Sequence, residues 1–194
     1  MTPPAREPHA LSAPPLPDPW LAAYGPLLAG APQGVVLDVA CGEGRNTLWA
    51  AGLGRQAVGL DVSSKALGRA RREALRARLP ARFVRWDVER SGLPPGPWAA
   101  VLIFHFLARD LLRAVHDAVV PGGVVIAKTH LHHPLRALGA RPRRRAFLLG
   151  SGELPGLCRG LEPVAYAEWA GRGGAYAAIA ARRPWRAYSP SSSS

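Results

Sequence analysis

The sequence predicts an α/β fold with a doubly wound, mostly parallel sheet of seven strands and an antiparallel C-terminal hairpin. Short apolar runs alternate with segments of helical periodicity, and this alternation is typical of a parallel sheet. The first apolar run, 35–39, leads into a turn containing Gly42 and Gly44, and a helix begins directly after it. Two late apolar runs are joined by the glycine-rich stretch 171–174, which indicates a hairpin.

The individual elements follow from these patterns and from the residues that flank them. Strands are expected at 35–39, 56–61, 82–86, 98–104, 123–129, 164–169 and 175–181. Helices are expected at about 18–28, 45–53, 63–79, 110–119 and 151–159. Asp18, Ser63 and Ser151 stand where a helix N-cap is expected, and Pro80 and Gly160 stand where helices should end.

The 194 residues are enough for one domain, which we place at 18–186, between a proline-rich stretch (1–17) and a serine-rich tail (187–194) that are expected to be disordered. No apolar run approaches the ~18 residues of a membrane-spanning helix. The chain opens without a signal-peptide pattern, and its 2 cysteines do not make a disulfide framework. These features predict a cytoplasmic protein without a membrane partner.

The net charge of +12 arises from 25 Lys and Arg against 13 Asp and Glu. A basic surface can attract nucleic acid, whereas the wealth of Ala, Arg, Gly and Pro also fits the codon bias of a GC-rich genome. The densest cluster comprises Arg141, Arg143, Arg144 and Arg145, and no aromatic residues interleave with it as stacking platforms. Codon bias is the favoured explanation, and nucleic-acid binding stays open.

The turn after the first strand has the features of a pocket for a nucleoside-containing cofactor. Glycines allow close approach of the backbone, and the following helix start offers free N–H groups. Asp61, at the end of the second strand, can accept hydrogen bonds from a ribose diol. A dinucleotide fits poorly, because Thr47 stands in the third glycine position. Asp38, inside the first strand, suits a ligand with an ammonium group, such as S-adenosylmethionine.

Residues 37–44, Leu-Asp-Val-Ala-Cys-Gly-Glu-Gly, resemble motif I of class I S-adenosylmethionine-dependent methyltransferases. The longer stretch 38–49 is similar to the short bacterial group related to the tellurite-resistance methyltransferase. Further matches lie at 58–63, 107–112, 121–126 and 152–154, so the likeness spans about 18–184. It implies a Rossmann-like fold, S-adenosylmethionine as cofactor and methyl transfer as the activity. Ala108, Asp110 and Lys128 depart from the pattern of the group on its substrate side.

The resemblance and the strand ends together predict the cofactor-binding residues Asp38, Ala40, Cys41, Gly42, Gly44, Arg45, Asn46, Asp61, Val62, Asp87, Val88 and Phe104. Asp38 should face the methionyl ammonium, and Asp61 the ribose. Val62 should pack on the adenine, while Asp87 and the Val88 N–H should bond its edge, unless Asp87 is a solvated turn residue. Arg45 and Asn46 either order the motif loop or solvate the surface.

Two residues are predicted to act on the methyl acceptor. His105 directly follows the fourth strand and is the candidate general base, with a packing role as the alternative. Arg109 either binds an anionic acceptor or pairs with an acidic neighbour. His130, His132 and His133 lie at the same rim, but without cysteine partners their spacing fits zinc poorly, and no metal is predicted.

The expected acceptor is a small molecule. The fourth strand leads into Phe-His-Phe-Leu (104–107), and not into the Asn/Asp-Pro-Pro-Tyr/Phe or Pro-Cys sequences of amino- and cytosine-methylating enzymes. The alternative is an RNA methyltransferase or RNA-binding relative that uses the arginine-rich surface. The sequence indicates neither the acceptor nor an oligomeric state.

Overall fold

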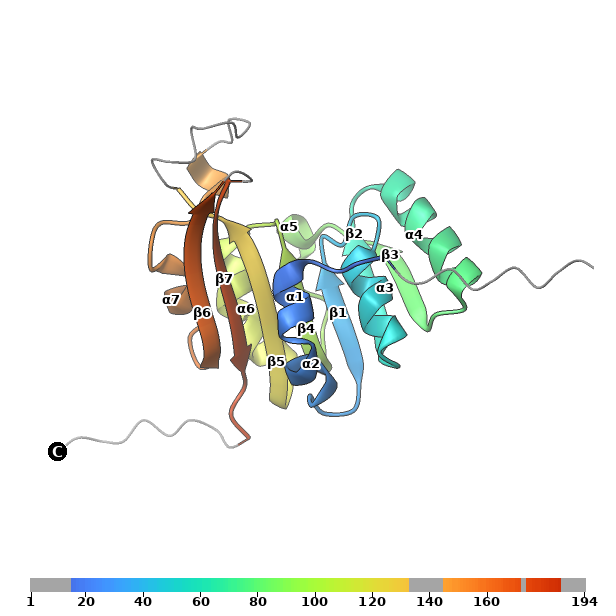
Figure 1. Ribbon diagram of the computed structural model, residues 1–194, viewed down its shortest axis with the longest axis horizontal. Helices are drawn as coiled ribbons and strands as arrows, with labels where there is room; N and C mark the ends of the chain where they lie inside the picture. The colour runs from blue at the N-terminus through green and yellow to red at the C-terminus, as the bar shows by residue number, and fades with distance from the viewer. Residues whose placement is uncertain (1–14, 133–144, 172–173, 186–194) are drawn as a thin grey trace, which may run out of the picture.

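The computed structural model describes residues 15–132, 145–171 and 174–185 (Figure 1). Its helices are α1 (Pro19–Ala23), α2 (Gly25–Ala29), α3 (Arg45–Gly52), α4 (Ser64–Ala77), α5 (Val88–Ser91), α6 (Arg109–Ala118), the 3₁₀ helix η2 (Arg145–Phe147) and α7 (Glu153–Leu157). Its strands are β1 (Val35–Val39), β2 (Gln56–Asp61), β3 (Ala81–Arg85), β4 (Trp98–Phe104), β5 (Val119–His130), β6 (Glu162–Gly171) and β7 (Gly174–Arg182).

The strands form a 7-stranded sheet in the order β3-β2-β1-β4-β5-β7-β6. Strands β1 to β5 pair in parallel, whereas β7 runs antiparallel to β5 and β6 antiparallel to β7. The predicted doubly wound fold with its terminal hairpin is therefore confirmed. Because β1 to β4 are parallel, the loops that follow them meet at one edge of the sheet.

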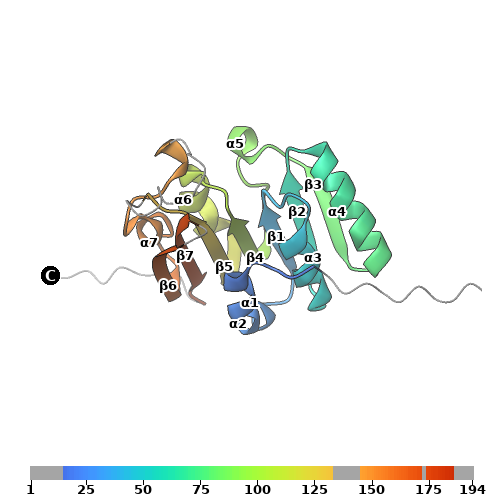
Figure 2. The same cartoon turned by 45° about the horizontal axis from the view of Figure 1, so that its top comes forward.

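Helices cover both faces of the sheet (Figures 1 and 2). On one face, Leu102 and Phe104 of β4 pack with Leu21 and Leu28 of α1 and α2. On the other face, the alternate residue Ile103 packs with residues of α6 and α7. This alternation is the period-two pattern of a strand that is buried on both sides. Helix α4 closes a separate small cluster around Phe83 of β3.

Several boundaries differ from the expectation. Ser63 caps α4, accepting from the Ala66 N–H at 3.2 Å as predicted. Ser151 is not a cap, because its hydroxyl donates to Glu168 Oε2 at 2.6 Å while the left-handed Gly152 stands at the start of α7. Helix α5 was not expected at all. Its single turn is capped by Asp87, and one Asp in a sequence is too common a signal to predict a helix.

The tails expected at 1–17 and 187–194 lie almost wholly outside the described residues. Within the described ranges, no helix combines the length and the apolar character needed to cross a membrane.

Candidate active site

The structure brings the motif turn and the end of β2 into direct contact. Asp61 Oδ2 accepts from the Gly42 N–H at 2.9 Å, and its Oδ1 accepts from the Ser63 N–H at 2.8 Å. The Cys41 N–H donates to the Leu60 carbonyl at 2.8 Å, which extends the β1–β2 pairing into the turn. The Asp61 carboxylate is thus fixed beside the backbone of the turn, with lone pairs left for further donors.

Glycine stands at two positions of the turn for different physical reasons. Gly42 has φ 58° and a Cβ there would meet nothing within 4 Å, so the backbone borders open space. Gly44 has φ 81°, and a Cβ would lie 2.6 Å from the Phe83 ring. Ala40 also takes a left-handed φ of 53°, which is uncommon for a residue with a side chain. Gly42 leaves room for a ligand, and Gly44 is required by packing.

Asp38 lies under this turn and is only 1% exposed. The Thr47 hydroxyl donates to its Oδ2 at 2.6 Å. Burial raises the pKa of Asp38 to about 7, and the Thr47 hydrogen bonds offset this only in part. A nearby ammonium would favour the ionised form of this carboxyl group.

Cys41 is a poor nucleophile in this setting. Burial, followed by the charges of Asp38 and Asp61, raises the pKa of its thiol well above its usual range. Since the thiolate is the reactive form, this thiol is inert at neutral pH.

A cleft of about 540 Å³ lies at the ends of β2 and β3, between Val62, Arg85, Trp86, Asp87, Arg90 and Ser91. Val62 is 55% exposed, so its apolar side chain is free to meet a ring. Asp87 Oδ1 accepts from the Glu89 and Arg90 N–H groups at 3.0 and 3.2 Å and caps α5. Val88, the first residue of α5, has a buried side chain, so its N–H is the group that remains for a ligand.

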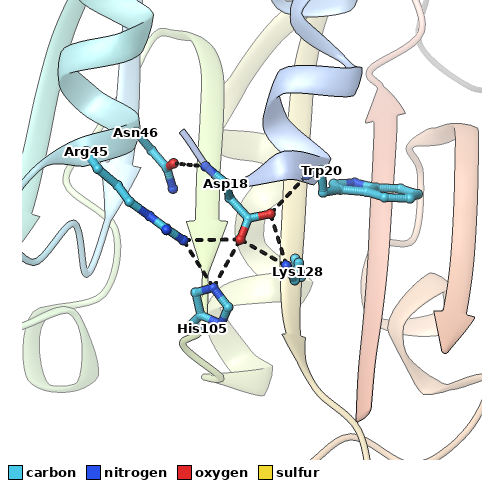
Figure 3. Close-up of polar contacts among 6 residues, drawn as sticks. All are labelled: Asp18, Trp20, Arg45, Asn46, His105 and Lys128. Carbon is cyan, nitrogen blue, oxygen red and sulfur yellow. Dashed lines mark hydrogen bonds and ion pairs between the residues drawn. The ribbon is translucent and has the colours of Figure 1, made fainter. Parts of the chain in front are cut away.

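The structure adds Asp18 and Lys128 to the predicted site (Figure 3). Asp18 is 1% exposed, and Lys128 Nζ donates to its Oδ2 at 2.9 Å and its Oδ1 at 3.1 Å. Arg45 donates to the same Oδ2 at 3.2 Å, while Asn46 Oδ1 accepts from the Asp18 N–H at 2.9 Å. The Arg-Asn pair therefore ties the segment before α1 to the start of α3.

Sequence reasoning saw Asp18 only as a helix cap, which the structure confirms through the Trp20 N–H at 3.0 Å. Lys128 was noted only as a departure from the family pattern. Burial by itself raises the pKa of Asp18, but hydrogen bonds from His105 and Lys128 outweigh it and bring that pKa down to about 2. The carboxylate is therefore ionised, and no sequence signal links it to a lysine 110 residues away.

His105 Nε2 lies 3.1 Å from Asp18 Oδ2, directly beyond β4. Its ring centre is 5.5 Å from that of His130 and 5.9 Å from that of Tyr176. Lys128 Nζ lies 4.8 Å from the centre of the Tyr176 ring and 5.6 Å from that of Trp169. The rim above β4, β5 and β7 is thus aromatic, with a cation beneath it.

Arg109 forms an ion pair with an acidic residue, which is the second of its two predicted roles. It donates to both carboxylate oxygens of Glu153, at 2.5 and 3.0 Å, and to the carbonyls of Ala146 and Leu148, each at 3.0 Å. The Glu153 hydrogen bond raises the pKa of Arg109 and lowers that of Glu153. These bonds fasten the segment before α7 to the start of α6, and the anion-binding role of Arg109 stays an untested prediction.

The remaining predicted residues fall as follows. The Phe104 ring is 6% exposed and packs in the core beside α1 and α2, which leaves its backbone for any cofactor contact. His133 and the cluster Arg141, Arg143 and Arg144 lie outside the described residues, as does the side chain of Arg145. Across the described part of the chain, no group of three His, Cys, Asp or Glu side chains is placed to hold a metal ion.

Comparison with known proteins agrees with this geometry. Residues 36–123 match the model of the family described as "Methyltransferase domain". An uncharacterized methyltransferase of Synechocystis sp. PCC 6803 is 34% identical over 114 residues, covering 55% of this chain and 51% of the relative. The chain therefore spans about half the length of this curated relative.

Two solved structures share the fold. TehB from Haemophilus influenzae superposes with a TM-score of 0.72 at 17% identity, over 87% of this chain and 62% of TehB. Magnesium protoporphyrin IX methyltransferase from Synechocystis PCC 6803, solved with bound S-adenosylhomocysteine, gives a TM-score of 0.65 at 18% identity, over 84% of this chain and 78% of that one. Residues 36–123 are therefore similar to the methyltransferase domain family, and the chain as a whole shares the fold of these solved structures.

Proposed function

We propose that this protein is an S-adenosylmethionine-dependent methyltransferase that acts on a small-molecule nucleophile. The observation that carries the proposal is the Asp61–Gly42 contact beside open space. It sets a carboxylate that would bind the ribose against a turn whose backbone a ligand can approach. The family match over 36–123 and the methyltransferases that share the fold support the same cofactor.

Several of the predicted cofactor residues have a proposed role that follows from their place. Asp61 would accept from the ribose hydroxyls. Val62, which lines the neighbouring cleft, would meet the adenine together with the N–H of Val88, the residue after Asp87. Asp38 and the backbone after Ala40 would face the ammonium end. An ammonium near Asp38 would make its ionised form the stable one, so binding should release a proton from this carboxyl group at neutral pH.

The bound cofactor would supply a methyl group activated by its sulfonium, and the protein would supply positioning. The acceptor would enter over the aromatic rim, where His105 stands at the end of β4. The small-molecule class is supported by the residues after β4, Phe104 to Leu107, which lack the base-methylating sequences. None of the comparisons speaks for RNA in particular, and the cytoplasmic location stays a prediction from composition.

Calorimetry with S-adenosylmethionine tests this proposal. Asp61→Asn should weaken binding at least tenfold, because one ribose acceptor is replaced by an amide. Asp110→Asn is the matched control, since that carboxylate is 98% exposed and pairs only with Arg113 among the described residues. Asp110→Asn should melt near the wild-type temperature, and Asp61→Asn should stay folded with a lower melting temperature, because its amide loses one of the two backbone hydrogen bonds. Equal affinity in Asp61→Asn and wild type would reject the site, and tight NADH binding would reject the cofactor.

A further inference from the structure

We infer that Asp18 is a positioning residue that holds His105 as the general base for methyl transfer to a protic acceptor. This inference rests on the proposed function and adds to it the class of acceptor. Its basis is the juxtaposition in Figure 3, where the segment before α1 delivers a buried carboxylate to the ring of a histidine at the end of β4.

The backbone of His105 is held in an unusual conformation. It has φ 57°, in the left-handed region that residues with side chains rarely occupy. Such outliers persist only where the surroundings impose them, and they cluster at functional sites. The side chain remains 35% exposed, so one edge of the ring is accessible while Nε2 faces Asp18.

The contacts of Nε2 decide where the ring carries its proton. Arg45 lies 3.3 Å from Nε2 and can only donate, so Nε2 either accepts from Arg45 or donates to Asp18. Donation to Asp18 is favoured, because it gives the carboxylate a charge-assisted hydrogen bond while Arg45 keeps its own bond to Asp18 Oδ2 at 3.2 Å. The reverse arrangement would set the ring lone pair against a carboxylate oxygen at 3.1 Å. The neutral ring is therefore protonated at Nε2, which leaves Nδ1 as the base.

Nδ1 is available for this role. Among the described residues, the hydrogen bonds of the His105 side chain involve Nε2 alone. The rings of His130 and Tyr176 stand against the ring of His105, with centres 5.5 and 5.9 Å away, and restrict its rotation. The charged groups around it are Asp18, Arg45 and Lys128, and their network is anchored by the buried Asp18.

The proton transfer balances without any further reactant. The acceptor oxygen or sulfur would give its lone pair to the methyl carbon of the cofactor. The bond from that carbon to the cofactor sulfur would break, and its electron pair would stay on the cofactor sulfur. The acceptor proton moves to His105 Nδ1. The resulting imidazolium is stabilised by the Asp18 carboxylate and later releases the proton to water. A held base is useful only for an acceptor that starts protonated, so a hydroxyl or thiol is favoured over a preformed oxyanion.

Nitrogen-15 NMR of the labelled protein at pH 8 tests the inference, with the His105 signals assigned by their loss in His105→Gln. The wild type should show protonated Nε2 and unprotonated Nδ1. Asp18→Asn keeps the shape and removes the charge, so the two tautomers should mix. Lys128→Met is the matched control and should keep the wild-type tautomer, since Asp18 still faces the ring. A wild-type proton on Nδ1, or an unchanged tautomer in Asp18→Asn, would overturn the inference.

The design separates the inference from the proposed function. If Asp18→Asn fails to fold because Lys128 loses its partner, Asp18→Asn/Lys128→Met removes both charges and should show the same mixing of tautomers. Calorimetry on the wild-type sample should detect S-adenosylmethionine binding. Loss of that binding in the wild type itself would reject the proposed function and the base role with it, whereas the tautomer alone decides whether Asp18 positions the ring.

Discussion

Two buried carboxyl groups, Asp18 before α1 and Asp38 at the end of β1, are each 1% exposed but differ in charge. Three cationic or donor groups, Lys128, Arg45 and His105, converge on Asp18. Burial raises the pKa of Asp18, but hydrogen bonds from His105, Lys128 and the Trp20 N–H outweigh burial and bring that pKa down to about 2. Asp38 accepts a hydrogen bond from the Thr47 hydroxyl, but burial has the larger effect and raises the pKa of Asp38 to about 7. Burial alone therefore does not set the charge of a group, because the partners decide whether desolvation is offset.

This difference in charge state distinguishes two sides of the candidate site. On the proposed acceptor side, the charge of Asp18 is already balanced, so this carboxylate serves to hold other groups. On the proposed cofactor side, Asp38 has fewer positive partners, and its charged form would gain stability from a cationic ligand.

Removing the acceptor-side carboxylate should have the largest effect. Asp18→Ala leaves Lys128 buried without its anion and deletes the cap of α1, and we expect it to lower the free energy of unfolding by about 3–5 kcal/mol. Urea denaturation measures this. Adding Lys128→Met should restore part of the loss. A loss below about 1 kcal/mol would show that the network contributes little.

On the cofactor side, the pH dependence should be unusual for a carboxyl group. The pKa of Asp38 is raised from 3.8 to about 7, so its contribution to stability is complete below 3.8 and is lost as pH rises through 7. Asp38→Asn does not titrate, and its stability relative to wild type should rise between pH 4 and 8 by up to about 4 kcal/mol. Denaturation curves across this range check it, and parallel curves would contradict the assignment.

Asp18 should show the opposite slope. Its pKa is lowered from 3.8 to about 2, so its contribution is present above 3.8 and is lost as pH falls through 2. Relative to Asp18→Asn, the wild type should lose about 2 kcal/mol of stability between pH 4 and 2. Acid titration followed by circular dichroism measures the difference. Equal acid sensitivity of the two proteins would remove the contrast with Asp38.

The smallest effect is expected at the partly exposed pair Arg109–Glu153. Arg109→Met or Glu153→Gln should each lower the free energy of unfolding by about 1 kcal/mol, and the double variant by less than the sum, because both remove one ion pair. S-adenosylmethionine binding should stay unchanged. A methyl-transfer rate that falls in Arg109→Met but not in Glu153→Gln would instead indicate that Arg109 contacts the acceptor.

Local patterns were sufficient for most of the fold. Strands 35–39, 56–61 and 98–104 lie at their predicted bounds, because each is an apolar run limited by turn residues on both sides. Helix α5 was missed since one Asp cap and one turn carry too little signal. Ser151 was misread as a cap, although its hydroxyl is bonded instead to Glu168 of β6, a strand that sequence spacing does not place beside it.

For the site, the motif turn and Asp61 could be placed from the sequence, because parallel strands bring their carboxyl ends to one edge regardless of side-chain detail. The matches at 107–112 and 152–154 supplied Arg109 and Glu153 separately, and only the fold shows that they are partners. In the same way, the sequence indicated only a helix cap at Asp18 and a departure from the family pattern at Lys128. The fold shows that the two residues form an ion pair.

By itself, then, the sequence determined the sheet, its hairpin and the turn that borders the open space at Gly42. Hydrophobic periodicity and backbone conformation encode these features over a few residues. The tertiary structure decided which charges meet, and through them the ionised state of Asp18, the neutral tendency of Asp38 and the orientation of His105. Such contacts join residues far apart in the chain, and their energies depend on the burial and distance that only packing sets.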